Sequence, residues 1–310
     1  MGLINRMITS YFVSIIRKIF QEHYDKKLIL NAKKISLLNL KKNKIKELSE
    51  IEFQVFSQWG EDGIIDWLIN KFSPIPKIFV EIGTEDYSES NTRFLLINKN
   101  WKGFLIEANK KDVEKIKKQR IYWKHDLKIQ NSFINADNVN DVIRNMNIPK
   151  DIGLLSIDID SIDYWVLKKL NALSPAIIIC EYNSLFGIKK PLTIPYKKKF
   201  LRSEEHYSNL YFGASIKAFE NLMKKKGYFL IGTNSAGNNA FFMKNKYLIK
   251  ANKMIMKKTI YKSKFRESRD NKGNLSFLDK KESLNLIRNK SLIDLKDNYK
   301  KKIDKLDLLN

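Results

Sequence analysis

Apolar residues between positions 51 and 246 occur in short continuous runs that are separated by amphipathic segments. Short apolar runs bounded by turn residues are typical of buried parallel strands. These runs cover residues 77–83, 103–108, 132–136, 152–160, 176–182, 228–232 and 240–243. Segments with helical spacing lie near 61–71, 90–99, 110–118, 138–146, 162–171 and 214–226. Strands and helices therefore alternate along this part of the chain.

The connections between the runs predict how the strands pair. Parallel neighbours need a crossover, usually a helix, and the first five connections are long enough to hold one. Only the turn-rich segment 233–239 separates the last two runs, so these two strands should form an antiparallel hairpin. The sequence therefore predicts an α/β fold with a doubly wound, mostly parallel sheet of seven strands and an antiparallel hairpin at its C-terminal end.

The two ends of the chain differ from this middle part in charge. Residues 1–50 carry 11 Lys or Arg against 4 Asp or Glu, residues 244–310 carry 20 against 8, and the residues between carry 27 against 22. The net charge of +24 thus comes mostly from the ends, and we expect no specific nucleic-acid binding by the domain itself. We predict a basic helical extension over 1–50, a Rossmann-like domain over 51–246, and a Lys/Asn-rich tail over 247–310. The tail has no strand-like run, so it should form surface helices or stay partly disordered.

Residues 7–20 have apolar positions close to helical spacing, but Arg17 and Lys18 interrupt them. The segment is also shorter than the roughly 18 to 20 apolar residues that span a bilayer. Its apolar face can pack on the protein or on a partner, or it can lie on an anionic membrane surface.

The only cysteine, Cys180, rules out an intramolecular disulfide and a cysteine-based zinc site. A reducing compartment fits this composition. We therefore expect a cytoplasmic protein, held at the inner face of the membrane if residues 7–20 bind lipid.

Polar residues follow each of the first five runs, where ligands bind in open α/β sheets. In chain order they are Glu81, Gly83, Glu85 and Asp86; Glu107 and Asn109; Asp137 and Asn138; Asp158 and Asp160; and Glu181 and Asn183. Because the carboxyl ends of parallel strands share one edge, these groups should form one polar rim. Gly83 would let a ligand approach the backbone, and Glu107 is suitably spaced to accept the hydroxyls of a ribose.

Several segments between residues 56 and 243 resemble the FkbM-type group of S-adenosylmethionine-dependent methyltransferases, which have the class I methyltransferase fold. They are FSQWGEDGII, FVEIGTEDYSESNTRFL, GFLIEAN, LLSIDIDSIDYWVL, IIICEYN, YFGAS and GYFLIGTNSAGNNAFFM. The resemblance implies methylation of a sugar or glycan hydroxyl in envelope polysaccharide biosynthesis. It also implies S-adenosylmethionine contacts by Gln58, Glu81, Gly83, Glu107, Asp137 or Asn138, and Asp158, of which Asp158 faces the transferable methyl group.

Methyl transfer to a hydroxyl requires that its proton be removed, and the carboxylates after the fourth and fifth runs allow two routes. Asp158, with Asp160 as its partner, can act as general base if its neighbours raise its pKa. Alternatively, Asp158, Asp160, Glu181 and Asn183 can hold a divalent ion that lowers the pKa of the hydroxyl. Oxygen ligands favour Mg²⁺ or Mn²⁺ over Zn²⁺.

Other interpretations stay open at this point. His206 is a further candidate base or a solvated loop histidine, and Asp163 is expected to cap the next helix. The DID sequence at 158–160 also resembles the Asp-x-Asp of metal-dependent glycosyltransferases. The sparse glycine loop after the first strand would also fit a non-catalytic protein that binds a membrane or partner and has a degenerate cofactor pocket.

Overall fold

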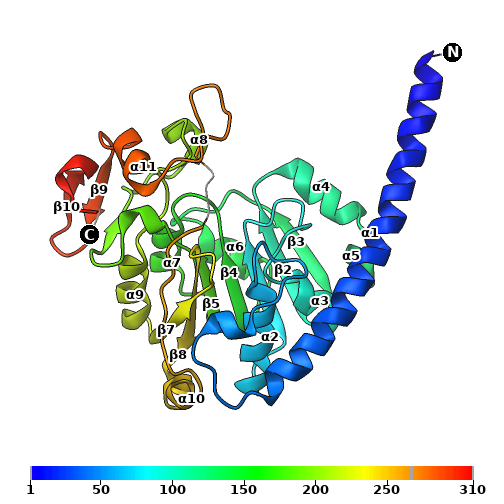
Figure 1. Cartoon of the computed structure of the whole chain (residues 1–310), viewed down its shortest axis with the longest axis horizontal. Helices are drawn as coiled ribbons and strands as arrows, with labels where there is room; N and C mark the ends of the chain where they lie inside the picture. Colours follow the sequence, from blue (N-terminus) through cyan, green and yellow to red (C-terminus); the bar gives the residue numbers. More distant parts are fainter. Residues whose placement is uncertain (1, 265–267, 309–310) are drawn as a thin grey trace.

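The chain begins with one long helix that leads into the domain (Figure 1). The computed structural model describes residues 2–264 and 268–308, and for residues 2–19, 21 and 22 it describes the backbone alone. The long helix, α1, spans Gly2–Lys41. It includes residues 7–20, but their side chains, apart from that of Phe20, lie outside the described part, so the predicted lipid contact of this segment stays a prediction.

Seven strands form a central sheet in the order β3-β2-β1-β4-β5-β8-β7 (Figure 1). Their bounds are β1 (Ile78–Ile82), β2 (Lys102–Glu107), β3 (Leu127–Asn131), β4 (Asp151–Ile157), β5 (Ser174–Glu181), β7 (Tyr228–Thr233) and β8 (Asn239–Lys244). The first five strands pair in parallel, and β8 pairs antiparallel with β5 and β7. The predicted sheet with its C-terminal antiparallel hairpin is confirmed. The strand order reverses between β1 and β4, as in a Rossmann-like, doubly wound fold.

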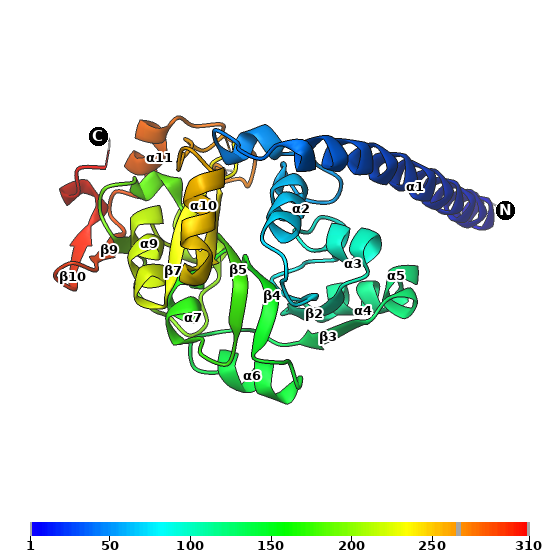
Figure 2. The ribbon, with the colours of Figure 1, turned by 90° about the horizontal axis from the view of Figure 1, so that it is seen from below.

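Helices cover both faces of the sheet, because successive side chains of a buried strand point to opposite faces. On β4, Leu155 packs with residues of α6 and α7, whereas Leu154 packs with residues of α2 and α3. The helices of this domain are α2 (Glu61–Lys71), α3 (Arg93–Lys99), α4 (Lys110–Lys118), α5 (Arg120–Lys124), α6 (Val139–Asn145), α7 (Asp163–Lys169), α9 (Ile216–Lys225) and α10 (Leu248–Met254). Figure 2 shows the resulting layers.

The third strand does not lie where the sequence pattern predicted it. β3 spans Leu127–Asn131, and the expected strand 132–136 is a loop. β3 is an edge strand with exposed Lys128, Gln130 and Asn131, so it shows no apolar run. The apolar residues of 132–136 are instead in a loop in which Ile134 packs into the core.

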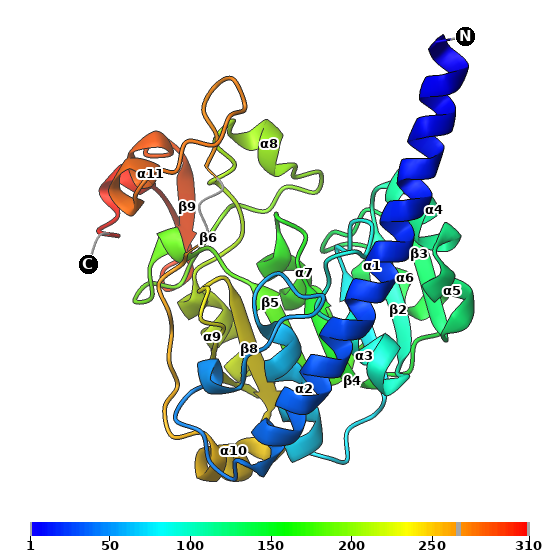
Figure 3. The same cartoon turned by 45° about the vertical axis from the view of Figure 1, so that its right-hand side comes forward.

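The tail contains strands that the sequence analysis did not predict. β9 (Ser291–Asp294) and β10 (Tyr299–Lys302) form an antiparallel sheet with β6 (Leu192–Thr193). α8 (Arg202–Glu205) and α11 (Lys280–Leu286) lie near this sheet (Figure 3). β9 and β10 escaped prediction because they are short and largely polar: β10 reads YKKK. The expectation of a tail without strands is therefore wrong, whereas the domain boundaries at 50 and 246 stay predictions.

Short 3₁₀ helices complete the described elements: η1 (Leu48–Ile51), η2 (Ser184–Phe186), η3 (Asn245–Tyr247) and η4 (Ile303–Lys305). No described helix, α1 included, combines the length and the apolar composition that crossing a membrane requires.

Candidate active site

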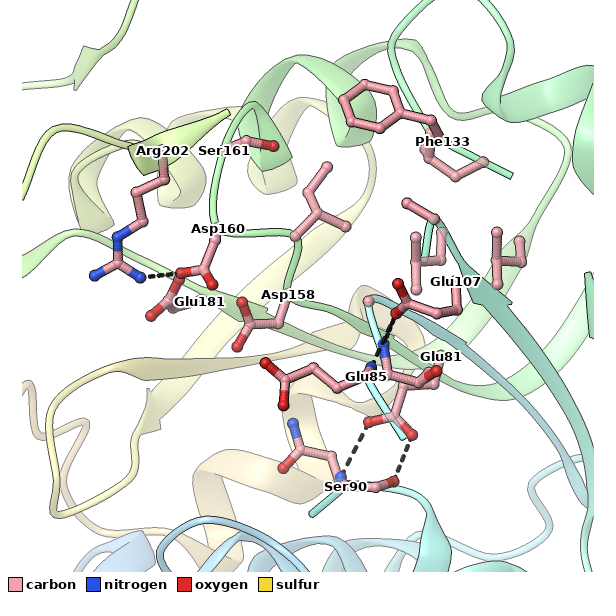
Figure 4. Close-up of a pocket in the computed structure, with 18 of the residues that line it drawn as sticks. Glu81, Glu85, Ser90, Glu107, Phe133, Asp158, Asp160, Ser161, Glu181 and Arg202 are labelled. Atoms are coloured by element: carbon pink, nitrogen blue, oxygen red, sulfur yellow. Dashed lines mark hydrogen bonds and ion pairs between the residues drawn. The ribbon is translucent and has the colours of Figure 1, made fainter. Parts of the chain in front are cut away.

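A cavity of about 380 Å³ lies at the carboxyl ends of β1, β2, β4 and β5 (Figure 4). This is the predicted edge of the sheet, and ligand pockets commonly have volumes of roughly 300–1,000 Å³. Its lining residues include Gln58, Glu81, Gly83, Glu85, Glu89, Glu107, Phe133, Asp158, Asp160, Glu181 and Arg202. Seven of these are carboxylic acids, and among the lining residues Arg202 is the only cation. The cavity is therefore strongly electronegative.

Glu81, at the end of β1, holds the loop that follows its strand. Its carboxylate accepts hydrogen bonds from the backbone N–H of Asn91 at 3.0 Å, the hydroxyl of Ser90 at 2.6 Å, and the hydroxyl of Thr92. Burial raises the pKa of Glu81 to about 7. Glu81 lines the cavity, at the predicted edge of the sheet. Its described hydrogen bonds go to the loop at residues 90–92, so they hold the wall of the cavity in place.

Gly83 follows β1 in a left-handed conformation, with φ +81°. A Cβ atom built there would lie 1.7 Å from the carbonyl oxygen of Asp158. Gly83 does line the cavity, but the space its missing side chain leaves is filled by the backbone at the end of β4. Close packing between the ends of β1 and β4 therefore explains why a glycine is needed here, in place of the predicted approach of a ligand.

Glu107, at the end of β2, is the predicted ribose acceptor. Its Oε2 accepts the N–H groups of Thr84 and Glu85, both at 2.9 Å, and its Oε1 accepts the N–H of Asn109 at 2.7 Å. A carboxylate has about four acceptor sites. Three are taken by backbone N–H groups, which leaves one for a ribose hydroxyl, and the predicted contact with the ribose stays a prediction.

Phe133 lines the cavity where Asp137 or Asn138 was predicted to contact adenine. Because β3 ends at Asn131, Ser132 and Phe133 come directly after the strand, and both line the cavity. The Asn138 side chain bonds the backbone at Asn135 and Phe133, and Asp137 pairs with Lys198 at 3.4 Å. Neither Asp137 nor Asn138 lines the cavity.

Asp158, Asp160 and Glu181 gather on the side of the cavity away from Glu107 (Figure 4). Each has a carboxylate oxygen within 4.8 Å of those of the other two. The guanidinium of Arg202 pairs with Asp160, donates from Nε to the carbonyl of Asn209 at 2.5 Å, and lies 4.1 Å from the ring centre of Phe212. The structure thus confirms the predicted proximity of the three acids and adds a cation that the sequence analysis missed.

Burial and like charges raise the pKa values of both Asp158 and Glu181. For each, burial is the larger cause, acidic neighbours add to it, and Arg202 opposes it. One oxygen of Glu181, Oε2, is buried without a partner among the described residues. Two neighbouring buried acids with raised pKa values favour a state in which they share one proton. The pair then keeps one carboxylate that can accept a further proton.

Two predicted site residues point elsewhere. The Asn183 amide donates to the carbonyls of Leu210 and Phe212, both at 3.0 Å, and its oxygen accepts the N–H of Leu185. Asn183 is thus a loop anchor, and it does not line the cavity. His206 also lies outside the lining, with its Nδ1 2.7 Å from the hydroxyl of Ser208.

Gln58 and Asp163 were predicted to contact the cofactor and to cap a helix, and only the cofactor contact of Gln58 stays a prediction. Gln58 lines the cavity. Asp163 is the first residue of α7, and its carboxylate accepts the N–H groups of Ile159 and Ser161 at 3.0 and 3.1 Å. It therefore closes the turn before the helix. The expectation that Asp163 caps α7 is wrong, because the N-cap residue is Ile162.

Arg202 and Phe133 are two lining residues with chemical potential that the sequence analysis did not single out. Arg202 stands in a polar segment between β6 and α9, far along the chain from the strand ends. A lone arginine there carries no sequence signal, whereas the aromatic residue straight after β3 becomes a candidate once that strand is correctly placed.

No protein-family model and no curated protein matches the sequence. The structure is similar to that of a putative caffeoyl-CoA O-methyltransferase from Staphylococcus aureus, at 15% identity over 59% of this chain and 82% of that one, with a TM-score of 0.40. It is also similar to an S-adenosylmethionine-dependent methyltransferase from Clostridium acetobutylicum, at 11% identity over 59% and 90%, with a TM-score of 0.38. The N-terminal domain of EvdMO1 with SAH bound matches at 9% identity over 70% and 94%, with a TM-score of 0.39.

Proposed function

We propose that this protein is an S-adenosylmethionine-dependent methyltransferase that methylates a sugar or glycan hydroxyl in envelope polysaccharide biosynthesis. The observation that carries the proposal is the cavity at the strand ends of a methyltransferase-type sheet, with Glu107 on one side and Asp158 near a second group of acids. The glycan acceptor and the cytoplasmic site of action rest on the resemblance to the FkbM-type group and on the composition.

The lining residues fit a nucleoside cofactor that carries positive charge. Glu107 has one acceptor site left for a ribose hydroxyl, and the partly exposed ring of Phe133 offers a stacking surface for a base. Burial and the surrounding acids raise the pKa values of Glu85 and Glu89, which marks an excess of negative charge that a cationic ligand would relieve. S-adenosylmethionine brings an activated methyl group, so the protein must bind, orient and exclude water.

Asp158 is the residue that we assign to the proton of the acceptor hydroxyl. Its raised pKa brings its basicity closer to neutral pH, where a general base works best. Arg202 opposes the rise in pKa of both Asp158 and Glu181, so that the pair keeps a carboxylate for the proton of the acceptor.

A divalent ion is the second way to handle this proton. The three oxygens of Asp158, Asp160 and Glu181 are close enough to share one ion, and carboxylates are the ligands that Mg²⁺ prefers. Arg202 already neutralises Asp160, which favours the metal-free route. We would remove divalent ions with a chelator and then add Mg²⁺. If neither step changes the activity, the metal route is excluded and the general-base route through Asp158 is left.

The test is transfer of labelled methyl from S-adenosylmethionine to a glycan extract of cell envelopes. We expect label that resists mild alkali, because ether methyl groups survive conditions that hydrolyse esters. Asp158→Asn should lower the rate about 10²- to 10⁴-fold, the contribution typical of a general base. Its affinity for the cofactor should change little.

The matched control is Asp151→Asn at the opposite end of β4, where the carboxylate is exposed and pairs with Lys244 at 3.1 Å. This variant should keep the wild-type rate. Equal rates for Asp158→Asn and the wild type would remove Asp158 from the chemistry, and labelling of protein alone would overturn the glycan acceptor.

A further inference from the structure

The described contacts between helix α1 and the domain come from the C-terminal half of the helix. Ala32 packs in a cluster with Phe53, Phe56 and Phe94, and the hydroxyl of Ser36 donates to Asp66 at 2.5 Å. Toward its N-terminus the helix extends past the rest of the molecule in all three views (Figures 1, 2 and 3). In Figure 2 the domain lies on one side of α1. The other side is therefore a long surface open to a partner.

The side of α1 that faces away from the domain is both apolar and basic. Its exposed apolar side chains are Phe20, Tyr24, Leu30, Leu37 and Leu38. Its exposed lysines are Lys26, Lys27, Lys33, Lys34 and Lys41, none of which pairs with a described acidic residue. The exposed fractions of Phe20 and Leu37 are 71% and 65%, and neighbouring exposed apolar side chains of this kind mark an interaction surface.

Acidic residues are absent from this face as far as its side chains are described. The only described acid between residues 20 and 41, Asp25, is half-buried and acts electrostatically on Arg93 of the domain. Residues 1–20 continue the pattern in sequence, with Arg6, Arg17 and Lys18, many apolar residues and no Asp or Glu. One further acid of the helix, Glu22, has a side chain outside the described part. The described charged side chains that face away from the domain are thus all lysines.

These features select among possible partners. A second copy of α1 would bring lysine against lysine, which disfavours association of two like helices. Nucleic acid would leave the exposed leucines and Phe20 unused. An anionic lipid surface uses both, because lysines contact the phosphates while apolar side chains enter the boundary between headgroups and acyl chains.

We propose that α1 is a membrane-docking helix that lies flat on a bilayer surface rich in anionic lipid. The proposal uses no residue of the cavity, so it stands independently of the methyltransferase assignment. It places the domain beside the bilayer surface, and it predicts that attachment weakens as salt screens the lysines.

The test is flotation of the full-length protein with vesicles of phosphatidylcholine, either alone or with about one third phosphatidylglycerol. We expect binding to the anionic vesicles only, and a loss of at least about tenfold when salt is raised from about 0.05 M to about 0.5 M. Leu30→Glu with Leu37→Glu, and separately Lys27→Gln with Lys34→Gln and Lys41→Gln, should each weaken binding by about tenfold or more.

Matched substitutions on the far side of the molecule serve as controls. Ile188→Glu with Tyr299→Glu changes two equally exposed apolar residues, and Lys224→Gln with Lys225→Gln and Lys300→Gln removes three exposed lysines. Both controls should bind vesicles like the wild type. Equal loss in controls and α1 variants would overturn the proposal. So would a dimer in solution that Leu30→Glu with Leu37→Glu converts to monomers in the absence of vesicle binding, because α1 would then serve a second copy.

Discussion

Carboxylates at the strand ends have two different roles: some bind the backbone of neighbouring loops, and others face the cavity without such bonds. Glu81, Glu107 and Asp163 accept backbone N–H groups and hold their own loops. Asp158 and Glu181 receive no backbone N–H from a described residue, and both are crowded by like charge. Sequence shows only an acid after a strand, so it cannot separate a carboxylate that holds a loop from one that is free for chemistry.

Glu81 offers a test of this distinction through pH. Its pKa is about 7 in the folded protein because of burial, against an ordinary value of 4.5. A carboxyl that binds its proton more tightly when folded contributes stability below about pH 4.5, and this contribution is lost as pH rises through about 7. Glu81→Gln has no such proton to lose. The free energy of unfolding should therefore fall more steeply between pH 5 and pH 8 in the wild type than in Glu81→Gln.

Urea unfolding of both proteins across this range measures the difference. Asp62 and Asp163, whose pKa values burial raises to about 6, titrate in both proteins and cancel in the comparison. A difference between the two proteins that stays constant with pH would mean that Glu81 is ionised in the fold throughout.

At the scale of elements, the continuous apolar runs predicted every strand of the central sheet except β3. β4 and β5 are buried on both faces, and such strands read as unbroken apolar runs. β3, at the sheet edge, alternates in burial and contains Lys128 and Gln130. Because of this misplacement, the sequence analysis named Asp137 or Asn138, and not Phe133, as the candidate for a contact with adenine. Arg202 was out of reach for another reason: only the three-dimensional fold brings its segment to the strand ends.

The close approach of β1 and β4 at Gly83 predicts a cost for any side chain there. Gly83→Ala combines a left-handed backbone with a Cβ 1.7 Å from the Asp158 carbonyl oxygen. It should lower the free energy of unfolding by about 2 kcal/mol or more, and displace Asp158. Gly227→Ala is the control, because Gly227 has a similar φ of +84° and nothing within 4 Å of its built Cβ.

Gly227→Ala should cost only about 1 to 2 kcal/mol from the backbone alone. Chemical denaturation of both variants measures these costs. Equal losses would show that backbone conformation, and not contact with Asp158, fixes Gly83.

At the scale of the whole molecule, the tail supports one wall of the cavity. β9 pairs with β6, the hydroxyl of Tyr211 donates to the carbonyl of Ser291 at 2.5 Å, and Lys290 lies 3.8 Å from Glu205 of α8. Between β6 and α9 lies the segment that carries Arg202 to Asp160. The tail thus supports the side of the cavity that contains Asp158, Asp160 and Glu181. The side that contains Glu107 is formed by β1 and β2.

Leu292 of β9 is fully buried, and its truncation tests this link. Leu292→Ala should lower the free energy of unfolding by about 2 to 5 kcal/mol and reduce turnover, while the affinity for the cofactor changes little. Tyr299→Ala in the neighbouring β10 is exposed and should change stability by less than about 0.5 kcal/mol. A loss of cofactor affinity as large as the loss of turnover would show that the tail supports the whole cavity.

The central claim is that the cavity binds S-adenosylmethionine, and isothermal titration of the full-length protein tests it most directly. We predict saturable binding at one site, with a Kd between roughly 1 µM and 1 mM, and about tenfold weaker binding by Glu107→Ala. A folded wild-type protein that takes up a nucleotide sugar but no S-adenosylmethionine at about 1 mM would contradict the account.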